Sequence, residues 1–202
     1  MMDEILYNNN NMKILQFTPY LAPHKWGLEK VAETISKYLV EWKYAKIINI
    51  TSSIDQSKHL NSFPKIIYKN KHIGYQKDNY EVISIPSFEI VHNFPCPKFW
   101  KSEFRIILQY IKSQKPDIIQ THTRFFLQTM IGWLIAKRLK KPRIHIEHGS
   151  GYVTGYPFYI KFCAKLFDNT IGKWIFRQSD KIVTISQNNI PFIQKFTKKN
   201  IS

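Results

Sequence analysis

The sequence is poor in the residues that would place it in several common classes. Only 7 of its 202 residues are glycine and 2 are cysteine. So little glycine excludes a collagen-like or low-complexity chain. Cys96 and Cys163 stand in unlike contexts, without the paired spacing of a disulfide framework or a zinc site. We therefore interpret both as free thiols of a reducing compartment, which favours a cytoplasmic protein.

Long apolar runs are also missing. The most apolar window, Phe125 to Ala136, contains Gln128 and Thr129 and is too short to span about 30 Å of hydrocarbon. Residues 1–11 are polar, include a run of asparagines and read as a short disordered leader, not as a signal peptide. We expect a protein without a membrane span, either soluble or peripheral on the inner face of a membrane.

Acidic residues are scarce. The chain has 14 Asp and Glu against 30 Lys and Arg, which gives a formal net charge of +16. Such an excess predicts an anionic partner, namely phosphates, nucleic acid or acidic lipid headgroups. A lysine-rich, solvated surface without any such partner explains the same composition, so both interpretations stay open. Hydrophobic residues make up 44% and aromatics 15%, enough for a sizeable core.

Several well-known sites are absent from the sequence. No Gly-x-Gly-x-x-Gly follows the first predicted strand, which argues against a dinucleotide site, and the Gly-x-x-x-x-Gly-Lys-Ser/Thr phosphate loop is missing too. No Gly-x-Ser-x-Gly nucleophile elbow occurs. His145 and His148 are three apart on a predicted strand, hence on opposite faces, so they should not share a metal. We expect neither a metal nor an organic cofactor.

Strand-like and helix-like segments alternate along the chain. Leu28, Val31, Ala32, Ile35 and Leu39 recur at the spacing of one helical face. Alternation of this kind predicts an α/β fold, with right-handed crossovers and a mostly parallel sheet covered by helices on both faces. The predicted strands are 13–17, 46–51, 65–68, 80–86, 117–121, 143–148 and 181–185; the predicted helices are 28–42, 100–111, 125–140, 162–178 and 190–198; and 88–97 is predicted as an irregular loop.

Three loops should meet at the carboxyl edge of that sheet, where open α/β sheets bind ligands. The first ends at Gly27, where the N–H groups of a helix start favour an anion, although a glycine before a helix is more often a simple cap or turn. The second contains His122 and Arg124, which suit hydroxyls or phosphate; the alternative is helix capping beside a packed core histidine. The third, His148-Gly-Ser-Gly151, is hard to explain by packing, and we interpret it as functional.

Taken in order, these segments resemble the N-terminal domain of the family-4 glycosyltransferases, which have the GT-B fold. The resemblance covers residues 12–202. Trp26 stands where the family has the first glycine of a pair. The matching segments are Lys13–Phe17, Trp26-Gly27-Leu28-Glu29, Pro116-Asp117-Ile118-Ile119-Gln120-Thr121-His122, Ile146-Glu147-His148-Gly149 and Ser179-Asp180-Lys181-Ile182-Val183-Thr184-Ile185-Ser186.

The resemblance implies a Rossmann-like lobe that takes part in transferring a sugar from a nucleotide sugar to an acceptor. Carried over by position, Gly27 would bind the donor phosphates through its backbone, and His148 would be the catalytic residue that faces the transferred sugar. The acceptor would be a sugar or a lipid-linked sugar, and a basic, aromatic-rich surface suits an anionic membrane face. The acceptor side would be lined by His122, Arg124, Gly149 and Ser150.

The family's C-terminal domain, which holds most contacts to the nucleotide, has no counterpart in 12–202. We therefore expect the nucleotide sugar to be shared with a missing C-terminal domain, and the 202 residues alone to be inactive. The alternative is a non-catalytic basic module that binds sugar or nucleic acid. The aromatic residues lie mostly at core-like helical spacing, so no specific nucleic-acid partner is expected.

Overall fold

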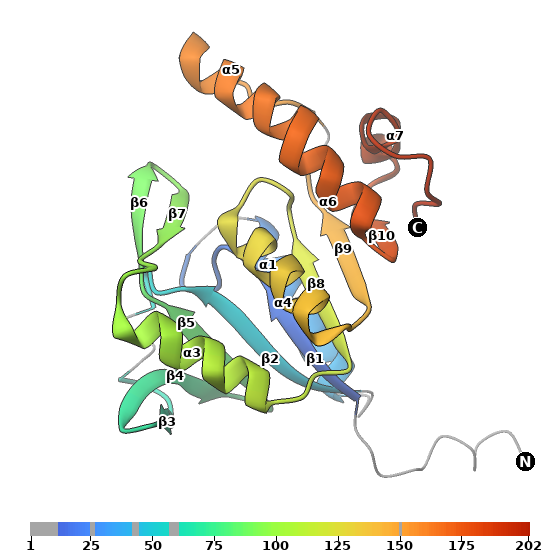
Figure 1. Ribbon diagram of the computed structural model, residues 1–202. Coiled ribbons are helices and arrows are strands. Elements are labelled where there is room, and N and C mark those ends of the chain that lie inside the picture. Colours follow the sequence, from blue (N-terminus) through green and yellow to red (C-terminus); the bar gives the residue numbers. More distant parts are fainter. Residues whose placement is uncertain (1–11, 25–26, 42–44, 57–60, 150) are drawn as a thin grey trace, which may run out of the picture.

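The computed structural model describes residues 12–202 except 25–26, 42–44, 57–60 and 150, so the predicted leader 1–11 lies outside the described residues. One sheet of eight strands forms the centre of the molecule (Figure 1). Its strands are β1 (Met12–Phe17), β2 (Ala45–Ser52), β3 (Lys65–Tyr68), β4 (Lys71–Lys77), β5 (Tyr80–Ile85), β8 (Ile118–His122), β9 (Arg143–Glu147) and β10 (Lys181–Thr184).

The order across the sheet is β10-β9-β8-β1-β2-β5-β4-β3. The six strands from β10 to β5 are parallel, and β4 and β3 extend the sheet as an antiparallel hairpin. The predicted α/β class with a mostly parallel sheet is therefore confirmed. From β1 the chain builds outward in one direction through β2 and β5, and in the other through β8, β9 and β10. In open α/β sheets, ligands bind where the strand order reverses in this way, outside the carboxyl ends of the two central strands, here β1 and β8.

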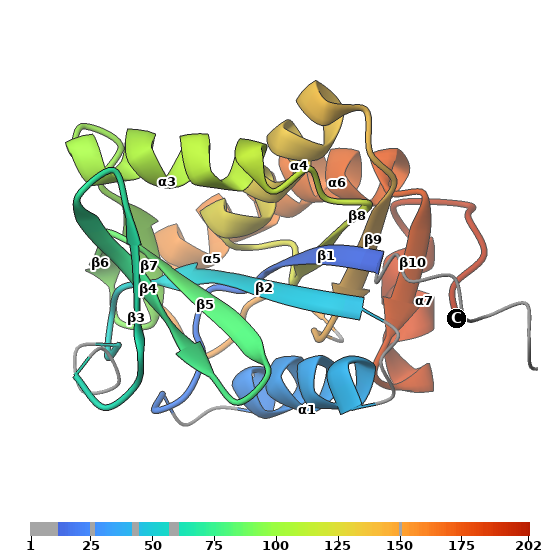
Figure 2. The ribbon, with the colours of Figure 1, turned by 90° about the horizontal axis from the view of Figure 1, so that it is seen from below.

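Helices cover both faces of the sheet, as the sequence predicted. Helix α1 (Gly27–Glu41) lies on one face, and α3 (Ser102–Ser113) and α4 (Leu127–Leu139) lie on the other (Figure 2). The α4 side is strongly apolar, with Leu15, Phe17 and Ile119 in its buried cluster. The chain continues through α5 (Phe158–Phe167), a π-helical turn (Asp168–Gly172), α6 (Lys173–Gln178), a short 3-10 turn (Gln187–Asn189) and α7 (Ile190–Gln194).

Helix α4 approaches the sheet closely because Gly132 faces it. A Cβ atom at Gly132 would lie 2.8 Å from Cγ2 of Thr121 and 2.9 Å from the ring of Phe17. A side chain there would push the helix away from the strands that carry the candidate site. Among the helices of the described residues, none is long and apolar enough to cross a bilayer.

The prediction of an irregular loop at 88–97 was wrong. Strands β6 (Ser87–Val91) and β7 (Phe94–Pro97) form an antiparallel ribbon in which Glu89 is opposite Pro95. Proline lacks the N–H of a ladder, so its presence argued against a strand, but an edge strand tolerates it. Strand β4 was also missed, because its charged and histidine positions mask the apolar alternation of a half-buried strand.

Candidate functional site

Two of the predicted site residues meet at the carboxyl edge of the sheet. His122 ends β8, and His148 directly follows the neighbouring strand β9. Nδ1 of His122 lies 2.9 Å from Nε2 of His148. The ring of His122 is fully buried and that of His148 is partly exposed. The pair therefore joins the interior of the sheet to its accessible edge.

A row of buried polar side chains continues from His122 across the sheet. Nε2 of Gln120 lies 3.0 Å from Nε2 of His122 and donates to Oε1 of Gln16 at 2.7 Å. Gln16 and Gln120 are direct neighbours in register on β1 and β8. Nε2 of Gln16 in turn donates to the carbonyl of Ala32 in α1 at 3.0 Å and to Asn49 on β2 at 2.6 Å. The row therefore links α1 to the histidine pair.

The direction of these hydrogen bonds fixes the tautomers of both histidines. The carbonyl of Ala32 can only accept, so the amide nitrogen of Gln16 faces it and Oε1 of Gln16 accepts from Gln120. Since Gln120 also presents its amide nitrogen to His122, Nε2 of His122 is the acceptor and Nδ1 carries the proton. That proton is donated to Nε2 of His148. His148 then carries its own proton on Nδ1, for which no acceptor lies within the part of the chain that the structure describes.

The surroundings of both histidines favour the neutral form. Burial lowers the pKa of His122 well below its ordinary value of 6.5, and the neighbouring His148 and His145 lower it further. Burial also lowers the pKa of His148 to about 4, against the opposing effect of Glu147. An uncharged imidazole with a proton on Nδ1 is a hydrogen-bond donor that adds no positive charge to the site.

Glu147 organises the loops around the histidine pair. It is fully buried, and its Oε1 accepts from the backbone N–H groups of His148 at 3.0 Å and Gly149 at 2.8 Å. Its Oε2 accepts from the backbone N–H of Arg124 at 3.2 Å. Burial alone would raise the pKa of Glu147, but the guanidinium of Arg124 and the ring of His145 hold it at about 2. The carboxylate is thus ionised and joins the loop after β8 to the loop after β9.

Arg124 lies beneath the accessible surface of the site. It is 1% exposed, and its Nε and Nη2 donate to the two carboxylate oxygens of Asp168 at 2.7 and 3.2 Å. Nη2 also donates to the carbonyl of Gly151 at 2.9 Å, and Nη1 lies 3.1 Å from Oε1 of Glu147. The sequence placed Arg124 on the acceptor side; in the structure its guanidinium bonds to the protein instead and connects both loops to the π-helical turn.

The backbone after β8 is held in an uncommon conformation. Thr123 has a φ of 56°, a left-handed value that costs a β-branched residue about 1–3 kcal/mol. The hydroxyl oxygen of Thr129 lies 2.8 Å from the carbonyl oxygen of His122 and 2.7 Å from that of Thr123, so its single proton is shared between them. The backbone N–H of Thr123 donates to the carbonyl of Ile146 at 2.9 Å. These bonds fix the chain between His122 and Arg124, so the strain lies beside the histidine pair.

The remaining predicted residues lie around this pair. A Cβ atom at Gly149 would come within 3.2 Å of Nη1 of Arg124 and 3.3 Å of Oε1 of Glu147, so a glycine allows the loop to approach them closely. Gly27 begins α1 and is exposed, and apart from its chain neighbours and its own helix backbone no atom of the described residues lies within 4 Å of the place a Cβ would take. Ser150 and Trp26 lie outside the described residues.

Sequence reasoning missed four of the residues that build the site. Gln16, Gln120 and Glu147 each interrupt an apolar strand of a sheet that is covered on both faces, and a buried polar side chain is itself a signal of a network. Asp168 carried no such signal, because its pairing with Arg124 depends on how the π-helical turn packs. Among the described residues, no group of three or more His, Cys, Asp or Glu is arranged to hold a metal ion.

Comparison with known sequences gives a consistent result. The sequence profile of Glycosyltransferase Family 4 matches residues 27–195. An uncharacterized glycosyltransferase of Methanocaldococcus jannaschii is 33% identical over 178 residues, which are 87% of this chain and 42% of that protein. The chain thus spans less than half the length of this relative.

Solved structures show the same fold at low sequence identity. Sucrose-phosphate synthase from Thermosynechococcus elongatus superposes with a TM-score of 0.66 and 11% identity, over 95% of this chain and 47% of that one. A UDP-glucose:anthocyanidin 3-O-glucosyltransferase in complex with UDP superposes with a TM-score of 0.53 and 12% identity, over 94% and 51% of the two chains. In both cases this chain corresponds to about half of the larger protein.

Proposed function

Because the chain belongs to glycosyltransferase family 4 and has the fold of one GT-B lobe, we propose that it is the acceptor-binding half of an enzyme that transfers a sugar from a nucleotide sugar. The observation that carries the proposal is the position of His148, whose Nε2 lies 2.9 Å from Nδ1 of the buried His122 at the carboxyl edge, beside the switch point of the sheet. Ligands of open α/β sheets bind at that edge.

His148 is proposed as the catalytic residue. A departing nucleoside diphosphate leaves a sugar with positive charge at its anomeric carbon, and fixed dipoles stabilise such a centre better than a mobile solvent does. A protonated imidazole would repel that charge, whereas the neutral ring of His148 donates from Nδ1 to a sugar hydroxyl. His122 is fully buried, so it acts through His148 by fixing its tautomer and position.

Gly27 is proposed to bind the donor phosphates. It begins a helix of 15 residues, whose free backbone N–H groups and dipole favour an anion. The space where a Cβ would point is open, so a phosphate can approach the backbone. Helix α1 also supplies the carbonyl of Ala32 to the polar row, and donor binding and the histidine pair therefore share one helix.

On the acceptor side we propose Gly149, which lies next to Arg124 and Glu147, together with Ser150, the next residue in the sequence. The acceptor is proposed to be a sugar or a lipid-linked sugar, and the site of action the inner face of a membrane. The net charge of +16 supports this assignment, because anionic headgroups attract such a surface.

The proposal is tested by a transfer assay. Radiolabelled UDP- and GDP-sugars are offered with a lipid extract as acceptor, first to the chain alone and then to the chain fused to the part of the Methanocaldococcus jannaschii relative outside the matched segment. We expect product only from the fusion, and at least 100-fold less from its His148→Ala variant. Turnover by the chain alone would contradict the division between two lobes, and full activity of the variant would contradict the role of His148.

The alternative function is a non-catalytic basic module that binds sugar or nucleic acid, and its nucleic-acid form rests on the charge alone. Binding of that kind is driven by the release of counterions from the nucleic acid, so it weakens steeply as the salt concentration rises. A titration of labelled RNA and DNA at rising salt tests it. We expect no binding near physiological salt, and tight binding there would favour the alternative.

A further inference from the structure

Helix α5 exposes large apolar side chains along one side. Of its ten residues, only Ala164 is buried. Phe158 is 78% exposed, Tyr159 67%, Phe162 59% and Leu166 56%. Figure 1 shows α5 extending away from the sheet, beyond the end of α4. A contiguous apolar surface of this kind marks a site of interaction.

The exposed apolar residues of α5 and its exposed lysines lie on separate, adjacent stripes of the helix. At 3.6 residues per turn, Phe158, Phe162 and Leu166 follow one another in a single stripe, and Lys161 and Lys165 form the stripe beside it. The helix contains no Asp or Glu. The next acidic residue, Asp168, is buried and bonded to Arg124. The apolar stripe is therefore flanked by positive charge without a compensating negative one.

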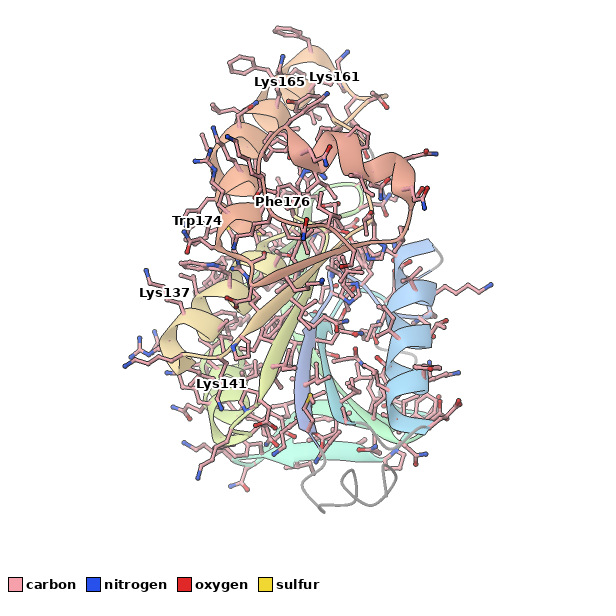
Figure 3. All side chains as sticks on the ribbon, turned by 90° about the vertical axis from the view of Figure 1, so that its right-hand side faces the viewer. Lys137, Lys141, Lys161, Lys165, Trp174 and Phe176 are labelled. Carbon is pink, nitrogen blue, oxygen red and sulfur yellow. The ribbon has the colours of Figure 1, made fainter. Side chains whose placement is uncertain are left out.

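The same chemistry continues onto the neighbouring helices. Figure 3 shows Lys161 and Lys165 at the outer end of the molecule, with Trp174, Lys137 and Lys141 following along one side. The ring of Trp174 in α6 lies with its centroid 3.5 Å from that of Trp133 in α4, and Nζ of Lys137 lies 5.2 Å from the ring centroid of Trp133. Aromatic and basic side chains thus extend from α5 along α6 and α4.

We propose that α5 lies in the interfacial layer of an anionic lipid bilayer, with its Phe158, Phe162 and Leu166 stripe among the acyl chains. Lys161 and Lys165 have long apolar stems that allow their ammonium groups to reach the headgroups. Charge complementarity selects this occupant. A second copy of a chain with net charge +16 would bring like charges together, whereas acidic lipid attracts each nearby lysine.

The proposal deepens the proposed function and rests on its membrane-bound acceptor, but binding to lipid is measured without turnover, so the two can fail separately. Helix α5 begins ten residues after His148 in the sequence, in the segment that leaves the carboxyl edge of the sheet. A bilayer contacted by α5 would therefore lie close to the edge where the acceptor is proposed to bind. A lipid-linked acceptor would reach that edge without leaving the membrane.

The test is co-sedimentation of the chain with vesicles of phosphatidylcholine, with and without phosphatidylglycerol. We expect the wild-type chain to bind the anionic vesicles, and the double variant Phe158→Ser/Phe162→Ser to bind them at least about tenfold more weakly. The matched control is Ile67→Ser, which removes an apolar side chain that is 65% exposed on the edge strand β3. This control should bind like the wild type.

A second pair of variants separates the contribution of the two α5 lysines from that of the net charge of the whole chain. Lys161→Gln/Lys165→Gln should weaken binding to anionic vesicles by about tenfold. Lys65→Gln/Lys112→Gln has the same net charge but changes exposed residues of β3 and α3, and should bind at least several-fold better. Melting curves followed by circular dichroism verify that each variant is folded.

A second readout reports insertion directly. An environment-sensitive dye on Cys163, an exposed thiol of α5, in a Cys96→Ser background should shift its emission to the blue when anionic vesicles are added. Three results would overturn the proposal: no binding of the wild-type chain at low salt, equal binding of the α5 variants and their controls, or binding without any shift of the dye. Concentration-dependent dimers that bury α5 without lipid would overturn it as well.

Discussion

Nδ1 of His122 lies 2.9 Å from Nε2 of His148. Through this contact, the direction of the hydrogen bonds in a buried polar row sets the tautomer of His148 at the accessible edge of the sheet. The row begins at a backbone carbonyl of α1 and passes through Gln16 and Gln120. Because each hydrogen bond of the row has one direction, the backbone carbonyl of Ala32 in α1 determines that the proton of His148 is on Nδ1. A buried network of this kind is rigid only while every member is satisfied.

Replacing Gln120 tests whether the buried polar row sets the tautomer of His148. Gln120→Leu removes the donor to Nε2 of His122 and leaves Oε1 of Gln16 without its partner, so the free energy of unfolding should fall by about 1–3 kcal/mol. His122 is then free to take either tautomer, and the ring ¹⁵N resonances of His148 should report a mixture. The control Gln109→Leu changes an exposed glutamine of α3 and should alter stability by less than about 0.5 kcal/mol. An unchanged single tautomer of His148 in Gln120→Leu would show that the buried polar row does not set it.

The lowered pKa of His148 predicts a loss of stability in mild acid. The unfolded chain binds a proton near pH 6.5, whereas the folded chain resists it down to about pH 4, so stability should decrease as the pH falls between these values. The shift corresponds to at most about 3 kcal/mol, and less because the ring is partly exposed. In His148→Gln, which still accepts from His122, urea unfolding at pH 7 and pH 5 should differ less than in the wild type. Identical differences would show that His148 does not titrate as described.

Glu147 predicts a larger effect. Glu147→Gln leaves the buried guanidinium of Arg124 with one carboxylate fewer, and the free energy of unfolding should fall by about 3–5 kcal/mol. The backbone N–H groups of His148 and Gly149 lose a charged acceptor, so their hydrogen exchange should accelerate more than that of β1. Glu41→Gln, at an exposed position of α1, serves as the control and should unfold like the wild type. Equal stabilities of the two variants would contradict a structural role for Glu147.

Two glycines offer a matched comparison. Gly132→Ala forces a Cβ to within 2.8 Å of Thr121 and should cost about 1–3 kcal/mol of stability. Gly27→Ala meets no atom within 4 Å and should be neutral, or stabilising by up to about 1 kcal/mol. If Gly27 binds the donor phosphates, its alanine variant should still weaken the affinity for UDP, measured by calorimetry on the fusion that also carries the second lobe. Unchanged affinity would remove Gly27 from the donor site.

The sequence predicted most of the elements that position the site. Apolar runs ending in polar loops predicted β1, β8 and β9, since a strand buried on both faces needs little else to be recognised. The face of α1 was only partly predicted. Ala32 is fully buried as expected, but Ser36 is buried beside it, because the polar row of the sheet lies beneath this helix. Periodicity identifies apolar faces and gives no weight to a buried serine that donates to a carbonyl.

The candidate site was less predictable than the fold. His122 and His148 stood out because they end neighbouring strands, yet their contact depends on the register between β8 and β9. Arg124 was identified by its charge, but its burial follows from Asp168, which is 44 residues away in sequence. Long-range pairings of this kind are set by packing and have no local signature.

The most direct test of the account is the protonation pattern of His148 in the wild-type chain at pH 7. A long-range ¹H–¹⁵N correlation spectrum, assigned with His148→Gln, reports the state of each ring nitrogen. We predict a neutral ring with the proton on Nδ1 and a bare Nε2 that accepts from His122. A ring protonated on Nε2, or on both nitrogens, would contradict the hydrogen-bonded row and the catalytic role built on it.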